Sequence, residues 1–220
     1  DEIVIVKDGI IRKNLYKYLI ECVEKKKIKL VESKKNIGLG LALNLGLNEC
    51  KYDIICRFDT DDISLSNRIS ESKKAFIKDP NLEIFGSNII EFIDAKSKFV
   101  KCNLKEVPKL NEAIHSTLDF RNPMNHPSIV FKKNSILKLG AYENIIFFED
   151  YHLWLKARKK NCKFMNTSKP LILMKRKSHS DRRQGYDYAR KEFKFYIVSM
   201  RQRLLNFKSY IVIPLRILSR

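Results

Sequence analysis

The segment Asp53-Ile54-Ile55-Cys56-Arg57-Phe58-Asp59-Thr60-Asp61-Asp62 joins a short apolar run to a cluster of acids. The run from Asp53 to Phe58 predicts a buried β-strand, and three carboxylates follow it within four residues. Carboxylates this close repel one another unless a cation lies among them. Their hard oxygen atoms suit Mg²⁺ or Mn²⁺, ions that keep water ligands and bridge to phosphates. Acidic clusters in loops also cap helices or form solvated turns, so the segment alone leaves a metal site and an ordinary turn both open.

The elements before this segment alternate between strand and helix. Such alternation predicts an α/β domain with a Rossmann-like, mostly parallel central sheet and helices on both faces. Ligands bind outside the carboxyl ends of the strands in sheets of this kind, and Asp8 and Asp59 stand at two such ends. The expected elements are strands at residues 2–6, 28–31 and 53–58 and helices at 15–23 and 41–48.

The second half of the chain predicts shorter strands with helices between them. We expect strands at residues 82–85, 89–93, 128–131, 163–166 and 171–174, and helices at 67–77, 109–118 and 150–160. No internal repeat or low-complexity linker divides these elements. The 220 residues therefore predict one domain with an appended tail.

Composition narrows the class of protein. The chain is 44% hydrophobic and 31% charged with only 7 Gly and 6 Pro, which excludes a disordered or fibrous protein. Its five cysteines stand far apart without zinc-type or redox spacing, so we expect reduced thiols. No apolar run approaches the roughly 20 residues that span a bilayer, and no leader opens the chain, which predicts a cytoplasmic protein. The start at Asp1, directly before an apolar strand, is read as a cut.

The net charge of +19 is concentrated near the end of the chain. From Lys169 to Arg220 there are fourteen Lys or Arg residues and three acids. We expect a domain at residues 1–180 and a basic amphipathic helical tail at 181–220, with one helix at 186–207 and another at 210–219. Apolar and basic side chains in residues 208–220 suit an anionic membrane surface. Packing against the domain or against a second subunit stays open.

Three further groups of residues carry possible chemistry. Asn36-Ile37-Gly38-Leu39-Gly40 precedes a helix, and its glycines let backbone amides approach a phosphate or ribose, although most such pairs are ordinary turns. Glu149 and Asp150 start a helix after two aromatics; they either stabilise the helix N-terminus or include a general base. Arg176 and His179 could contact a phosphate or a metal, although a solvated loop histidine is commoner.

In this order the motifs resemble family 2 glycosyltransferases of the GT-A fold, in the group of bacterial capsule and lipopolysaccharide enzymes. The resemblance spans Glu2 to about Ser180, and the first strand and helix of the family domain are missing upstream. The motifs are Lys7-Asp8-Gly9, Asn36-x-Gly38-x-Gly40-x-Ala42-x-Asn44, Arg57-Phe58-Asp59-Thr60-Asp61-Asp62, Arg68, Gly86-Ser87, Asn125-His126-Pro127-Ser128, Leu139-Gly140-x-Tyr142, Glu149-Asp150-x-x-Leu153-Trp154 and residues 176–179.

The resemblance implies a role for each candidate residue. Asp150 is implied as the base that deprotonates the acceptor hydroxyl, with Glu149 beside it. A metal, Mn²⁺ or Mg²⁺, is implied at Asp61, Asp59 and His179. The implied donor site consists of Asp8, Asn36, Gly38, Asp59, Asp62 and Arg176.

The resemblance also implies a reaction and its partners. The expected enzyme is an inverting, metal-dependent hexosyl- or N-acetylhexosaminyltransferase that uses a nucleotide-sugar, expected to be UDP-linked. Its expected acceptor is a glycan or lipid-linked glycan of the cell surface, reached from the cytoplasm or from the inner face of the membrane. No specific nucleic acid is expected.

Some positions depart from the family pattern. Lys7 stands where an acid is usual, Ile10 where a small hydroxyl residue is usual, and Leu43 where many relatives have Arg. Two alternatives therefore stay open. One is a basic nucleic-acid-binding protein, suggested by the charge, although no reading motif is present. The other is an inactive relative that binds a glycan or acts as a scaffold.

Overall fold

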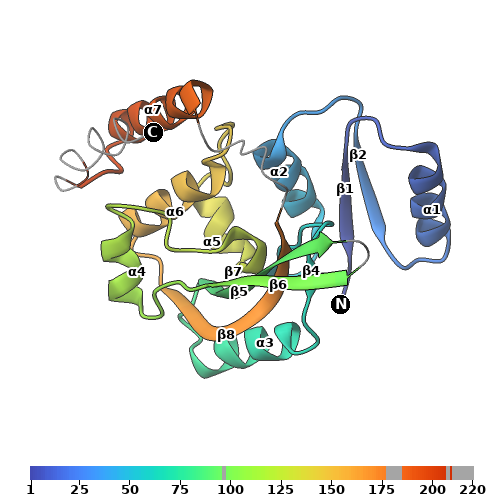
Figure 1. The fold of residues 1–220 in the computed structure, drawn as a ribbon, viewed down its shortest axis with the longest axis horizontal. Helices are drawn as coiled ribbons and strands as arrows, with labels where there is room; N and C mark the ends of the chain where they lie inside the picture. Colours follow the sequence, from blue (N-terminus) through green and yellow to red (C-terminus); the bar gives the residue numbers. More distant parts are fainter. Residues whose placement is uncertain (96–97, 177–184, 207–208, 210–220) are drawn as a thin grey trace.

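The computed structural model describes residues 1–95, 98–176, 185–206 and 209. Its first part is a small parallel sheet in which β1 (Val4–Asp8) pairs with β2 (Lys29–Ser33). The helix α1 (Lys13–Glu24) joins these strands, and α2 (Leu39–Glu49) packs against them. Gly46 permits this packing, because a Cβ there would lie 2.8 Å from a methyl carbon of Val6. In Figure 1, α2 lies between this small sheet and the rest of the molecule.

The larger sheet has six strands in the order β3-β7-β5-β8-β4, with β6 also paired to β5. Its centre is formed by two long strands, β5 (Ile84–Ala95) and β8 (Phe164–Lys175), which run parallel. The remaining pairings in this sheet are antiparallel. The other strands are β3 (Ile54–Cys56), β4 (Ile63–Ser64), β6 (Lys98–Lys105) and β7 (Val130–Lys132).

Helices cover both faces of the larger sheet, and neighbouring residues on one strand assign the faces. On β5, Ile84 belongs to a core with α4, α5 and α6, whereas Phe85 packs with Ala75 of α3. This alternation is the two-residue period of a strand. In Figure 1, α3 lies on one side of the sheet and α4, α5 and α6 on the other. These helices are α3 (Arg68–Lys78), α4 (Asn111–Thr117), α5 (Lys133–Lys138) and α6 (Glu149–Lys159), and a 3₁₀ turn, η1 (His126–Ser128), precedes β7.

The expected α/β class with helices on both faces is confirmed, but the strand pairings are more mixed than the mostly parallel sheet we expected. Two of the six pairings between described strands are parallel. The reason is that β6 returns directly along β5, and that the short strands β3 and β4 pair only with strands that run the other way. The two strands expected at residues 163–166 and 171–174 are one strand, β8, which continues through Pro170 because this residue lies at a register shift where it need not donate to the ladder.

The last described helix, α7 (Gly185–Arg201), confirms the start of the helix expected at residues 186–207. It packs on α6: the rings of Phe195 and Phe148 are stacked with centroids 4.9 Å apart, and Phe195 also contacts Tyr151. The helix expected at 210–219 lies outside the described residues. Among the helices that are described, none combines the length and apolarity needed to cross a bilayer.

Candidate active site

The acidic segment after β3 begins with an ion pair. Both terminal nitrogens of Arg57 donate to the Asp59 carboxylate. Arg57 is only 6% exposed, and its backbone carbonyl accepts a hydrogen bond from the buried guanidinium of Arg68. The Asp59 carboxylate is therefore held by an arginine that is itself buried and hydrogen-bonded. The sequence drew attention to the acids and to Arg68, but the positioning role of Arg57 emerges only from the structure.

Asp62 and Asp61 differ in their exposure to solvent. Asp62 is 8% exposed, and its Oδ1 accepts the backbone N–H of Lys175 at 2.9 Å, which ties the segment to the end of β8. Burial, together with the charges of Asp59 and Asp61, raises the pKa of Asp62 to about 6. Asp61 is exposed. Of the two, Asp61 is the carboxylate that a solvent-borne ligand can reach.

Asp8 at the end of β1 organises the glycine-containing loop before α2. Its Oδ1 accepts the N–H of Ile37 at 2.8 Å, and its Oδ2 accepts the N–H of Gly38 at 3.2 Å. The side chain of Asn36 also accepts from Gly38, at 3.2 Å. Gly38 has a φ of 90°, a conformation that favours glycine. Asp8, Asn36 and Gly38, which were predicted to belong to the site for the nucleotide-sugar donor, are therefore connected by hydrogen bonds.

The start of α2 lies directly against the start of α6. A Cβ on Gly40 would be 2.9 Å from the carbonyl oxygen of Glu143 and 3.4 Å from the Cβ of Glu149, so the approach requires glycine. Asn44 reinforces the junction, since its side chain exchanges hydrogen bonds of 2.8 and 3.0 Å with the backbone of Tyr142. The loop organised by Asp8 and the Glu149-Asp150 pair are therefore neighbours, although more than 100 residues separate them in sequence.

Asp150 is held by a residue that the sequence analysis did not single out. The side-chain amide of Asn122 donates to Asp150 Oδ2 at 2.6 Å. Asn122 is itself oriented, because its Oδ1 accepts the N–H of Met124 at 3.1 Å. The N–H of Tyr151 donates to the other oxygen of Asp150 at 2.8 Å. Glu149 is buried and Asp150 half-buried. The only sequence signal for Asn122 is its place before Pro123, which also fits an ordinary turn.

Tyr142 connects the two groups of acids. Burial raises the pKa of its hydroxyl, and the carboxylates of Asp150, Glu149 and Asp59 raise it further, whereas Arg57 lowers it. The Arg68 guanidinium, which donates to the carbonyl of Arg57, also donates to that of Pro127 at 3.1 Å, so the acidic segment is joined to the turn that contacts the Tyr142 hydroxyl. The same hydroxyl lies 3.1 Å from Nε2 of His126, so this histidine forms a hydrogen bond within the fold.

The predicted metal ligands are only partly brought together. In the described part of the chain, no three His, Cys, Asp or Glu side chains form a group that could hold a metal ion. Asp59 is paired with Arg57, Asp61 is exposed, and His179 lies outside the described residues. Arg176 is exposed, and its backbone N–H donates to Phe92 at 2.8 Å. The carboxylates fit Mg²⁺ or Mn²⁺ that takes its remaining ligands from water and phosphate.

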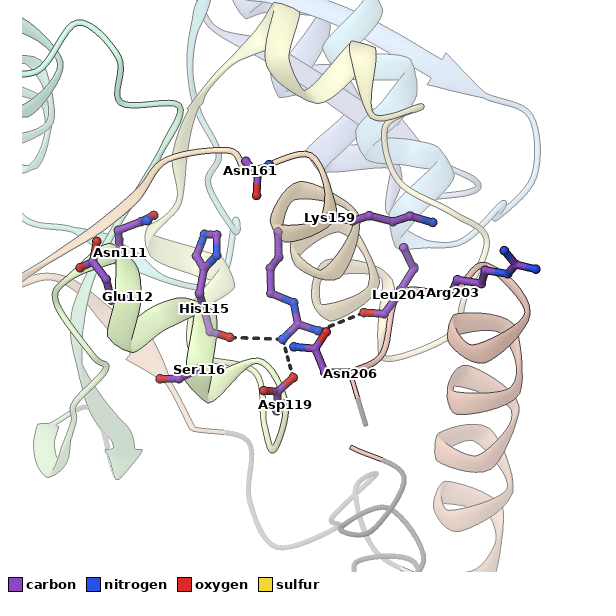
Figure 2. Close-up of a pocket in the computed structure, with 11 residues that line it drawn as sticks. Asn111, Glu112, His115, Ser116, Asp119, Lys159, Asn161, Arg203, Leu204 and Asn206 are labelled. Carbon is purple, nitrogen blue, oxygen red and sulfur yellow. Dashed lines mark hydrogen bonds and ion pairs between the residues drawn. The ribbon is translucent and has the colours of Figure 1, made fainter. Parts of the chain in front are cut away.

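A separate cavity of about 580 Å³ lies at the far end of α6 (Figure 2). None of the predicted site residues lines it. Its centre is Arg158, which donates to Asp119 at 2.6 Å and to the carbonyls of His115 and Leu204 at 3.2 and 3.0 Å. These contacts join α4, α6 and the segment after α7. The cavity wall is therefore a structural junction, and we assign no chemistry to it.

Replacing Arg158 with Met is expected to lower the free energy of unfolding by about 3–5 kcal/mol, because Asp119 would remain buried without its partner. Urea denaturation followed by circular dichroism measures the effect. Lys159→Met is the matched control, since Lys159 is exposed and its Nζ contacts only the carbonyl of Gln202 within the described residues. An equal loss in the two variants would contradict the role assigned to Arg158.

The sequence is similar to a known family over most of its length. Residues 1–146 match the model "Glycosyl transferase family 2". The amylovoran biosynthesis glycosyltransferase AmsE of Erwinia amylovora is 34% identical over 199 residues, which cover 89% of this chain and 73% of that protein. A UDP-Gal:alpha-D-GlcNAc-diphosphoundecaprenol beta-1,3-galactosyltransferase of Escherichia coli is 33% identical over 214 residues, which cover 96% and 76%.

Solved structures show the same fold at low sequence identity. The mannosyltransferase PcManGT of Pyrobaculum calidifontis, in complex with GDP-Man and Mn²⁺, superposes with a TM-score of 0.62 at 13% identity and covers 96% of this chain. GalNAc-T7 with UDP, GalNAc and Mn²⁺ gives 0.68 at 13% identity and 90% coverage. This chain spans 58% and 41% of those two chains. The expected GT-A fold is confirmed.

Proposed function

Because the chain belongs to glycosyltransferase family 2, we propose that it transfers a hexosyl or N-acetylhexosaminyl group from a UDP-sugar to a hydroxyl of a bacterial surface glycan, with inversion at the anomeric carbon. The observation that carries this proposal is that the loop organised by Asp8 and the Glu149-Asp150 pair, from separate segments, meet at Gly40. Family membership accounts for the motifs without invoking nucleic acid. The hydrogen bond from Asn122, which orients the Asp150 carboxylate, favours an active enzyme over an inactive relative.

The donor site proposed here has two sides. On one side are Asp8, Asn36 and Gly38, where the loop before α2 would contact the nucleoside. On the other side are Asp59 and Asp62, with Arg176 at the end of β8. The second side is supported by the hydrogen bond from the Lys175 N–H to Asp62, which places the acidic segment beside Arg176. Loop amides next to a helix N-terminus are suited to a charged ligand.

A divalent ion would be held by Asp61, with Asp59 and His179 as the other proposed ligands. When bound, it would neutralise the charge that develops on the leaving diphosphate. The proposal is supported by the exposure of Asp61 and by Mn²⁺ in complexes of proteins with the same fold. In this arrangement, Arg57 keeps Asp59 ordered until a ligand competes for its oxygens.

In the proposed reaction, Asp150 is the base. Its carboxylate accepts the proton of the acceptor hydroxyl while the oxygen forms a bond to the anomeric carbon. The bond from that carbon to the diphosphate oxygen breaks at the same time, and the diphosphate leaves with the bonding electrons. Attack and departure on opposite faces invert the configuration. The bond from Asn122 orients the carboxylate for this transfer.

The domain boundaries and the location form part of the proposal. We assign the transferase domain to residues 1–180 and the basic tail to 181–220. Support comes from the elements on either side of this boundary, since β8 ends at Lys175 and α7 begins at Gly185. The acceptor is proposed to be a glycan or lipid-linked glycan at the inner face of the membrane.

A thermal-shift screen of nucleotide-sugars tests the donor site. We expect a UDP-sugar at 100 times its Kd to stabilise the native state by roughly 2.7 kcal/mol, with Mn²⁺ present and much less with EDTA. Inorganic diphosphate with Mn²⁺ serves as the comparison, because it tests the charge without the nucleoside. If every nucleotide-sugar gave the same small shift as diphosphate, the proposed donor site would be wrong.

A further inference from the structure

The outward face of α7 is unusual for a helix packed on a domain. One side is buried through Tyr188, Phe195 and Tyr196, among other residues. The opposite side carries large apolar groups in water, since Tyr186 is 86% exposed and Phe193 53% exposed. At 100° per residue, the exposed positions fall on one stripe. We define the outward stripe of α7 as the exposed residues Tyr186, Arg190, Phe193, Lys194 and Arg201, together with Ile197, which is half-buried among them.

The charge of the stripe is positive. Arg190, Lys194 and Arg201 are all exposed. The exposed acid nearest to them is Asp187, at the edge of the stripe, and its carboxylate is already paired with Lys191. The buried acid Glu192 points to the other side of the helix. Cations interleaved with a ring and an aliphatic side chain are the pattern of a helix that lies in a bilayer interface.

We propose that the outward stripe of α7 docks on an anionic lipid surface. Phe193 and Ile197 would enter the boundary of the acyl chains, and the cations would stay with the headgroups. A phosphate backbone of nucleic acid would use the cations but would leave these two apolar groups in water. The convex face of a single helix also suits a flat bilayer. The stripe lies wholly in the described residues and is distinct from the tail segment 208–220.

The position of α7 gives this docking a consequence for catalysis. Tyr188 packs on Phe148 and Phe147 with ring centroids 5.5 and 6.1 Å apart, and Lys191 lies 4.9 Å from the centre of the Phe147 ring. Phe147 and Phe148 directly precede Glu149 and Asp150. Docking would therefore hold the proposed base roughly one helix diameter, about 10–12 Å, from the membrane. This consequence rests on the proposed function, whereas the docking itself does not.

Vesicle co-sedimentation of the full chain tests the docking without donor or acceptor. The stripe variant is Arg190→Glu/Phe193→Ser/Lys194→Glu. The matched control is Lys73→Glu/Ile77→Ser/Lys78→Glu on α3, where the three side chains are also exposed. Helix α3 lies on the opposite side of the molecule from α7 (Figure 1). Both variants change the net charge equally. Circular dichroism confirms that each is folded.

With vesicles of phosphatidylglycerol and phosphatidylcholine, we expect the stripe variant to bind at least about 10-fold more weakly than wild type, since each cation near an anionic surface contributes about 5-fold. The α3 control should bind within about 3-fold of wild type.

Equal losses in the two variants would show binding by net charge alone and would overturn the proposal. It would also fail if the stripe variant lost self-association in sedimentation velocity but kept vesicle binding. Activity on a water-soluble acceptor should survive in the stripe variant, so this failure is distinguishable from failure of the transferase assignment.

Discussion

Replacing Asp150 with Asn is expected to lower kcat by about 10²- to 10⁴-fold, because the acceptor hydroxyl would lose its proton acceptor. The substitution keeps the size of the side chain, and its amide oxygen can still accept the hydrogen bond from Asn122. Donor binding should therefore remain close to wild type. Release of UDP under saturating donor measures kcat, and calorimetric titration of the donor with Mn²⁺ measures binding.

Two further variants separate the base from its neighbours. Asn122→Ala should reduce kcat by roughly 10- to 100-fold, because the carboxylate remains but loses its orientation. Glu149→Gln tests the other acid of the pair, which is buried against Gly40. If Glu149→Gln removed activity while Asp150→Asn retained the wild-type rate, the base would be assigned to the wrong residue.

The sequence predicted the order of the main elements because their local signals agree with their tertiary surroundings. The apolar runs at residues 2–6 and 53–58 fall on β1 and β3, and the glycines at 38 and 40 fall at the start of α2. It did not predict β6, whose lysines and asparagine look like a loop. That strand exists because it folds back on β5 and pairs with it, and this pairing overrides a composition that does not favour a strand.

The candidate site shows the same division. The acids could be found from the sequence, since carboxylates after apolar runs are conspicuous. Arg57 and Tyr142 stand in the motifs, but their supporting contacts, and Asn122 itself, could not be predicted. Only the fold places these residues against Asp59, the junction of α2 with α6, and Asp150. The expected grouping of Asp59, Asp61 and His179 as metal ligands remains a proposal.

Replacing Asp61 with Asn is expected to lower kcat by at least about 10³-fold, a loss comparable to that of Asp150→Asn. A metal at a leaving diphosphate contributes several kcal/mol of charge stabilisation, and each 1.36 kcal/mol corresponds to a factor of ten in rate. Asp61 is chosen because it is exposed, whereas Asp62 is buried and serves to hold Lys175. An amide binds Mn²⁺ far more weakly than a carboxylate, so the variant should also need more Mn²⁺ for half-maximal activity.

The metal itself provides the complementary test. Treatment of wild type with EDTA should abolish transfer, and added Mn²⁺ or Mg²⁺ should restore it, whereas Asp61→Asn should recover only partly at high Mn²⁺. Glu112→Gln on α4 is the control, because it removes an exposed carboxylate that lines the distant cavity. Full turnover of wild type in EDTA would exclude the proposed role of the ion. Normal metal dependence of Asp61→Asn would instead move the ion to other ligands, since the reaction would still need its charge at the diphosphate.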